Sequence, residues 1–252
     1  MAGHSKWANI KRRKGAQDAK RAKVFTRILK EIAIAVKEGG NPDPDSNPRL
    51  RLAIANAKGV NMPKDNINRA IKKASDKDSE NYAEVTYEGY GPAGIALFVE
   101  ATTDNINRTV SNVRAIFTKY GGSLGTNGSL EFIFDRKGVF TIPVSALEGK
   151  DMDEFEMELI DGGAEDVEKD EEFVTIYTSF EDFGNMQKKL EELGIEAESQ
   201  ELQRIPKTTS EVEFEDGKKV LNIIEKFEED DDVNNVYHNM EMTDELAEAM
   251  EE

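Results

Sequence analysis

A run of cations opens this 252-residue chain and could pair with phosphate groups. The first 30 residues contain ten Lys or Arg and a single acid, Asp18. Clustered ammonium and guanidinium groups bind polyanions because each phosphate contact releases a condensed counterion. The density of this run favours a polyanionic partner over a solvated helix face. The candidate nucleic-acid contacts are Lys6, Lys11, Arg12, Arg13, Lys14, Lys20, Arg21, Lys23, Arg27 and Lys30, helped by Arg49 and Arg51 and by Lys72 and Lys73.

Trp7, the single Trp of the chain, lies among these cations and has two possible roles. An indole ring can stack on an exposed base while neighbouring cations pair with phosphates. It can equally pack against the following helices and anchor the basic arm. Both roles stay open from the sequence, and we include Trp7 among the candidate contacts.

A second polar segment runs from Thr102 to Thr109 and is followed by a glycine-rich stretch at 121–129. A dinucleotide site needs the order strand, glycines, helix, whereas these glycines follow a predicted helix and precede a predicted strand. The chain also lacks the Gly-Lys-Ser/Thr of a phosphate-binding P-loop. Helix caps and a tight turn are therefore the expected roles. A possible secondary contact surface consists of Asn105, Asn107, Arg108 and Arg114.

The chain offers little material for catalysis. It has no Cys, and its two His residues are His4 in the arm and His238 near the end. Asp230–Asp232 beside His238 could hold Mg²⁺, but this segment lacks the glycine and closing Glu of a calcium loop, so we expect a solvated turn. No Ser or acidic residue has the spacing expected of a catalytic triad or of a set of metal ligands. We predict no catalytic residue, metal, cofactor or small-molecule substrate.

The charge of the chain is split between its two parts. Residues 1–74 hold 18 basic and 6 acidic residues, whereas residues 75–252 hold 15 and 45. The absence of Cys fits a reducing compartment. The most apolar run near the N-terminus, Ile32–Val36, is far shorter than the roughly 20 residues that a membrane span needs. No signal-peptide core follows the basic start, so we expect a cytoplasmic protein without a membrane partner.

Helical spacing of apolar residues organises the N-terminal part. It predicts a helix over 19–38, ended by Gly39-Gly40, and a second from Asn47-Pro48 to Gly59, with Asn47 as N-cap and proline in the first turn. A third helix opens at Pro63. Residues 1–78 are therefore expected to be a basic helical domain with an N-terminal arm.

The rest of the chain alternates strands and helices. Strands over 82–90 and 95–101 flank a Gly-Pro turn, a helix capped by Asp104 buries Ile106, Val110, Val113 and Phe117, and a strand covers 130–134. Residues 139–205 then show the order β-α-β-β-α-β of a ferredoxin-like fold. A strand over 212–214, a helix over 220–227 and a strand over 233–238 follow.

Two of these segments are too short to bury a core alone. We therefore expect residues 79–136 and 207–240 to complete one α+β domain, with a ferredoxin-like α+β domain inserted at 137–206. Residues 241–252 form an acidic tail with at most a short surface helix. The expected fold class is multidomain α+β.

Three sequence segments resemble one family. They are Met1-Ala2-Gly3-His4-Ser5-Lys6-Trp7-Ala8-Asn9-Ile10-Lys11, Asn47-Pro48-Arg49-Leu50-Arg51 with Asn61-Met62-Pro63, and Tyr87-Glu88-Gly89-Tyr90-Gly91-Pro92 leading to Asp104-Asn105 and Asn107-Arg108-Thr109. Together they resemble the YebC family, which includes probable bacterial transcriptional regulators and mitochondrial translational activators of cytochrome oxidase. The resemblance covers essentially the whole chain and implies the same three-domain layout.

We therefore expect a non-enzymatic, nucleic-acid-binding regulator of gene expression. Its partner is DNA or rRNA, with the ribosome as a further possibility, and the sequence does not distinguish them. The resemblance also allows a ribosome-associated translation factor that assists elongation through proline-rich stretches. An acidic protein-interaction module, with the arm as a tether, is the alternative of another class. No recognition helix of a helix-turn-helix motif is identifiable.

Overall fold

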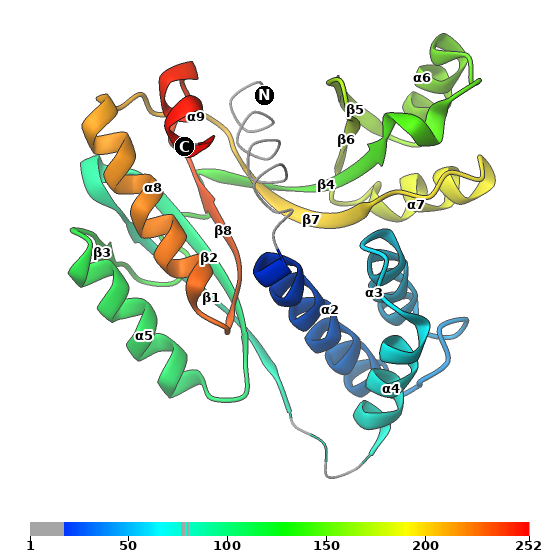
Figure 1. The fold of residues 1–252 in the computed structure, drawn as a ribbon, viewed down its shortest axis with the longest axis horizontal. Helices are drawn as coiled ribbons and strands as arrows, with labels where there is room; N and C mark the ends of the chain where they lie inside the picture. Colours follow the sequence, from blue (N-terminus) through cyan, green and yellow to red (C-terminus); the bar gives the residue numbers. More distant parts are fainter. Residues whose placement is uncertain (1–17, 77–78, 80, 252) are drawn as a thin grey trace. The chain divides into compact units, whose positions relative to one another are not determined.

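The structure is a computed structural model that describes residues 18–76, 79 and 81–251 (Figure 1). The described residues form eight α-helices, α2 to α9, and two four-stranded sheets whose paired strands run antiparallel. The chain divides into two compact units. Among the described residues, the first unit comprises 18–30, 79, 81–135 and 205–251, and the second comprises 31–76 and 136–204.

The first unit is built on the sheet order β3-β1-β2-β8. Strands β1 (Ala83–Tyr90) and β2 (Ala96–Thr103) form the predicted hairpin, with Tyr90 opposite Ala96. The turn includes the 3-10 helix η1 (Pro92–Gly94), and Gly94 has a φ of 74°, which a residue without Cβ adopts easily. Strand β8 (Val233–His238) pairs with the other edge of β2, so distant parts of the chain meet in one sheet.

Strand β2 lies at the centre of this unit and is buried on both faces. Leu97 and Val99 face a core that also contains helices α5 (Ile106–Lys119) and α8 (Phe214–Glu229). Phe98 points the other way, toward Leu130 and Phe134, because side chains alternate along a strand. Phe117 and Phe227 meet edge to face, with ring centroids 4.8 Å apart, where α5 and α8 cover the sheet (Figure 1).

Three sequence expectations for this unit are wrong. Residues 129–133 form turns, and the strand on the other edge of β1 is the two-residue β3 (Ser123–Leu124). Residues 212–214 contain no strand, because α8 already begins at Phe214. The expected surface helix of the tail, α9 (Asp244–Glu251), places Leu246 in the core with 1% of its surface exposed.

The sheet of the second unit has the strand order β5-β6-β4-β7. The elements run β4 (Phe134–Pro143), η2 (Val144–Leu147), α6 (Met152–Asp161), β5 (Ala164–Lys169), β6 (Phe173–Ser179), α7 (Phe183–Glu192) and β7 (Ser199–Pro206). Phe155 and Leu159 of α6 and Met186 of α7 pack on Phe140 and Ile176 of the sheet. This is the predicted order of strands and helices.

The helices of the second unit follow the capping signals in the sequence. The helix α2 (Asp18–Gly39) contributes its last turns, and α3 (Pro48–Gly59) begins with Asn47 as N-cap. The Asn47 side chain accepts from the Leu50 amide at 3.0 Å and donates to the Ala35 carbonyl at 2.7 Å. Four residues separate α3 from α4 (Lys64–Ser75), and Asn61 among them has a φ of 57°.

Asn56 joins α3 to β7 within the same unit. Its side chain donates to the Gln200 carbonyl and accepts from the Gln200 amide, at 3.0 and 2.9 Å. Within the described residues, no helix is both long and apolar enough to cross a membrane.

Candidate functional site

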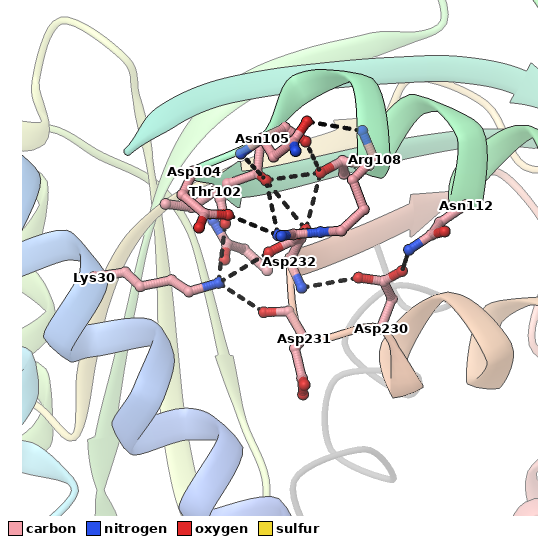
Figure 2. A network of polar contacts seen from close by, with 12 residues as sticks. Lys30, Thr102, Asp104, Asn105, Arg108, Asn112, Asp230, Asp231 and Asp232 are labelled. Atoms are coloured by element: carbon pink, nitrogen blue, oxygen red, sulfur yellow. Dashed lines mark hydrogen bonds and ion pairs between the residues drawn. The ribbon is translucent and has the colours of Figure 1, made fainter. Parts of the chain in front are cut away.

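The carboxylate of Asp232, in the turn between α8 and β8, accepts hydrogen bonds from several residues of the first unit (Figure 2). The residue is 6% exposed. Its Oδ2 accepts from Arg108 Nη2 at 2.6 Å, Thr109 Oγ1 at 2.9 Å and Thr103 Oγ1 at 3.1 Å. Lys30 Nζ lies 3.5 Å from Oδ1. We call Asp232 and these four residues the Asp232 network.

The topology of the sheet brings these residues together. Thr103 ends β2, and Asn105 then caps α5 by accepting from the Arg108 amide at 3.1 Å. Arg108 and Thr109 consequently lie in the first turn of α5, where both side chains donate to the Thr103 hydroxyl at the end of β2. Asp232 comes just before β8, which pairs with β2. Neighbouring strands therefore place the donors and the acceptor at the same end of the sheet.

Three cations of helix α2 also donate hydrogen bonds to this part of the first unit. Lys30 Nζ donates to the Thr102 and Asp231 carbonyls at 3.0 and 2.8 Å. Lys23 Nζ donates to the carbonyls of Asp230, at 2.6 Å, and of Glu228. Arg27 Nη1 donates to Asn235 Oδ1 at 2.9 Å. The structure thus gives three of the candidate phosphate contacts, Lys23, Arg27 and Lys30, partners within the protein.

Burial and ion pairing act in opposite directions on these groups. Burial alone would raise the pKa of Asp232, but hydrogen bonds from Arg108, Thr109 and Thr103 and the charge of Lys30 outweigh it and hold this pKa below its usual value. Burial lowers the pKa of Lys23 despite the acids around it. Asp232 is therefore ionised at neutral pH, and its Oδ2 accepts hydrogen bonds from three residues of β2 and α5, which suits it to hold these elements together.

The expectation of a solvated turn at Asp230–Asp232 is wrong for its last residue. Asp230 supports the turn, since its Oδ1 accepts from the Asp232 amide at 2.9 Å and its Oδ2 from Asn112 Nδ2 at 3.0 Å. In the part of the chain that the structure describes, no group of three or more His, Asp or Glu is placed to hold a metal ion.

The structure separates the four residues of the predicted secondary contact surface. Asn105 is the N-cap of α5, a role that the sequence assigned to Asp104, and Arg108 belongs to the Asp232 network. Asn107 and Arg114 are exposed on α5. The expected burial of Ile106 is also wrong, since half of its surface is exposed.

Most of the predicted basic arm lies outside the described residues, including Lys6, Trp7, Lys11, Arg12, Arg13 and Lys14, and the same holds for the Lys20 side chain. Arg21 lies over the Phe25 ring, 5.5 Å from its centroid. Arg49 pairs with Glu38, and Arg51 is exposed on α3.

Helices α3 and α4 present further exposed cations in the second unit. Residues 48–75 contain seven Lys or Arg and one acid, Asp65. Arg69, Lys72 and Lys73 follow the three- and four-residue spacing that places side chains on one helix face. This spacing was visible in the sequence, but our prediction included only Lys72 and Lys73. The exposed cations of the two helices are Arg49, Arg51, Lys58, Lys64, Arg69, Lys72 and Lys73.

The two sheets and the helices around them define a multidomain protein of mixed α+β class. Residues 5–77 match the family model described as the TACO1/YebC protein N-terminal domain, and residues 82–240 match the model described as the TACO1/YebC second and third domain. The chain belongs to the TACO1/YebC family, which confirms the resemblance found in the sequence.

Two similar proteins support this assignment. A relative from Amoebophilus asiaticus (strain 5a2), described as a probable transcriptional regulatory protein, is 55% identical over 242 residues, which are 95% of this chain and 98% of the relative. The crystal structure of a conserved hypothetical protein from Aquifex aeolicus is 42% identical and has a TM-score of 0.80. The matched region covers 90% of this chain and 93% of the Aquifex aeolicus chain.

Proposed function

We propose that this chain is a non-enzymatic regulator of gene expression that binds nucleic acid through its N-terminal arm and the basic faces of α3 and α4. The observation that carries the proposal is the concentration of exposed cations on these two helices, where one acid accompanies seven Lys or Arg. Such a surface gains affinity for phosphates by releasing counterions. The name of the Amoebophilus relative supports a regulatory role.

The contacts of α2 refine which cations bind. Lys23, Arg27 and Lys30 already donate to the protein, so moving them to phosphate would break hydrogen bonds that they now make. These bonds join α2 to residues about 200 positions away. We therefore assign the main contacts to the cations between Lys6 and Lys14 and to the exposed Arg51, Arg69, Lys72 and Lys73. Arg69 also donates to Asp65 and Asn66, but these contacts lie within its own exposed helix. Their target is DNA or RNA in the cytoplasm.

The layout proposed from the sequence accompanies this function. Residues 1–78 form the basic helical domain, 79–136 and 207–240 the middle domain and 137–206 the insertion. Residues 241–252 are the acidic tail, whose Leu246 packs into the core of the middle domain. The order β4-α6-β5-β6-α7-β7, with β4 between β6 and β7, supports a ferredoxin-like insertion. Its acidic surface repels phosphate, which directs nucleic acid to the helical domain.

The salt dependence of binding tests the proposal. With about six phosphate contacts, log affinity plotted against log salt should fall with a slope of roughly -5 on duplex DNA and about -4 on single strands. Replacing Lys11, Arg12, Arg13 and Lys14 by Gln should weaken binding and flatten the slope without changing the melting temperature. An unchanged slope would refute the role of the arm.

A matched pair of triple variants tests α4. Arg69→Gln, Lys72→Gln and Lys73→Gln together should weaken binding. Replacing Lys218, Lys219 and Lys226 of α8, each paired with a nearby carboxylate, removes the same charge and should have a smaller effect. Equal effects of the two variants would show that only net charge matters.

Crosslinking combined with polysome sedimentation identifies the target. Contacts on chromosomal DNA would support a transcriptional role, and contacts on rRNA would support the ribosome-associated alternative. Deletion of residues 1–17 leaves the α2 contacts intact and tests the interaction-module alternative, since such a module would keep its partners.

A further inference from the structure

Helix α6 carries two large apolar side chains on its outward face. Met157 and Ile160 are 65% and 66% exposed, whereas Phe155 and Leu159 on the opposite face are buried in the core of the second unit. Residues three apart on a helix are neighbours on its surface, so Met157 and Ile160 form one apolar patch. Isolated exposed apolar residues are common, but an adjacent pair at this exposure favours a contact surface.

Carboxylates surround this patch at helical spacing. Asp153 and Asp161 lie four residues before and after Met157, and Glu156 lies four residues before Ile160. All three side chains are exposed. Among the described residues, no cation pairs with the carboxylates of Asp153 or Glu156. Glu158, nearer the core, is paired with Lys189 at 2.8 Å.

We propose that this face of α6 docks a Lys- and Arg-rich polypeptide segment of another protein. Apolar side chains of the segment cover Met157 and Ile160, and its cations pair with Asp153, Glu156 and Asp161. Residues 151–161 contain six acids and no base, so phosphate groups of nucleic acids and anionic lipids are repelled. A second copy of the same face is excluded for the same reason, because a twofold contact would place these carboxylates against each other.

The patch predicts a weak, fast-exchanging interface. Two apolar anchors with a charged rim resemble transient contacts, and exposed charge pairs mainly steer association. Affinity should therefore fall with salt, while the apolar pair decides where the partner sits. This site is independent of the nucleic-acid site proposed above, because α6 carries the opposite charge.

A synthetic helical peptide of about 18 residues, or five turns, with Leu on one face and Lys or Arg on the other, is the probe. Titrated into the full chain and followed by NMR, it should shift the amides of α6 most. The Met157→Gln, Ile160→Gln double variant should bind at least about tenfold more weakly, with an unchanged melting temperature. The control is Ile106→Gln with Phe132→Gln, which changes two exposed apolar residues of the first unit and should bind as the parent does.

Several outcomes would overturn the proposal. Equal binding by the double variant and the parent, or amide shifts spread over all acidic surfaces, would show only nonspecific attraction of a basic peptide. A peptide with Ser in place of Leu that binds equally well would remove the role of the apolar pair. A photo-crosslinker at position 157 should capture Lys- and Arg-rich segments in cells, and capture of acidic segments or nucleic acid would also contradict it. The variant with Gln at positions 11–14 tests the nucleic-acid proposal separately. Its loss of nucleic-acid binding would not change the binding of the basic peptide to α6.

Discussion

Arg108 Nη2 lies 2.6 Å from Asp232 Oδ2, although the two residues are 124 positions apart in the chain. The same guanidinium reaches Asp104 at 2.8 Å, so a single side chain bridges two carboxylates. Asp232 is buried whereas Arg108 is nearly half exposed. The contact therefore serves mainly to satisfy a buried charge, and it fixes the first turn of α5 against the segment that enters β8.

Replacing Asp232 by Asn should destabilise the first unit by about 2–3 kcal/mol, because Arg108 and Lys30 lose their shared anion. The chain has two units, so hydrogen exchange at α5 amides reports this loss better than one global transition. Asp231→Asn is the control, because Asp231 is exposed and receives Lys30 through its main-chain oxygen. Equal protection of α5 in both variants would contradict the role of Asp232.

The Asp232 network also predicts a dependence on pH. Its partners hold the folded-state pKa of Asp232 below the ordinary aspartate value of about 4. The contribution to stability is then fully present above that ordinary value and is lost as the pH falls through the folded-state pKa. The stability difference between the parent and Asp232→Asn should be constant near neutral pH and shrink below about pH 4. Urea midpoints at several pH values measure it, and a constant difference down to about pH 2 would refute the prediction.

Glu88 of β1 should prove essential to the loop that follows β3. Its buried carboxylate accepts from the Gly128 and Leu130 amides at 2.7 and 2.6 Å. Glu88→Gln puts an NH₂ group where an acceptor is needed and should cost about 1–3 kcal/mol. Faster exchange of these two amides is the expected observation. The exposed Glu131→Gln is the control, and equal exchange in the two variants would exclude this anchor.

Two glycine substitutions should have opposite effects. A Cβ at Gly89 would lie 2.5 Å from the Ser123 carbonyl oxygen and 2.7 Å from the Phe117 ring, so Gly89→Ala should destabilise by about 1–3 kcal/mol. Gly184 in α7 has open space around a Cβ, and Gly184→Ala should stabilise by roughly 0.5–1 kcal/mol. Thermal unfolding monitored by circular dichroism shows whether each substitution lowers or raises the melting temperature. Destabilisation by both substitutions would show that the steric distinction is wrong.

Local signals in the sequence predicted most of the elements. Asn47-Pro48 marks the start of α3 through a cap that needs only neighbouring residues. The hairpin of β1 and β2 is likewise encoded by alternation and its turn. The predictions failed where the local structure depends on a residue that is distant in the sequence. Residues 130–134 alternate like a strand, but Glu88 takes up the Leu130 amide and holds a turn there.

The candidate site was harder to predict for the same reason. Asp232 lies in an acidic run that looks solvated, and its burial depends on Arg108 and Lys30, both more than 100 positions away. A shift of one residue in the cap also changed α5. With Asn105 as N-cap, the buried face is Thr109, Val113 and Phe117, which leaves Ile106 exposed.

Because β2 pairs with β8, this edge of β2 stays unpaired during synthesis until β8 has been made. Residues after Thr103 leave the ribosome at about 5–20 per second, so the roughly 130 residues before β8 take about 7–26 s to appear. During that interval one edge of the central strand has no partner, and Phe227, which packs on Phe117, has not yet been made. The second unit, by contrast, has all of its residues once β7 emerges. The open edge of β2 is therefore the place where a nascent chain is most exposed to wrong pairing.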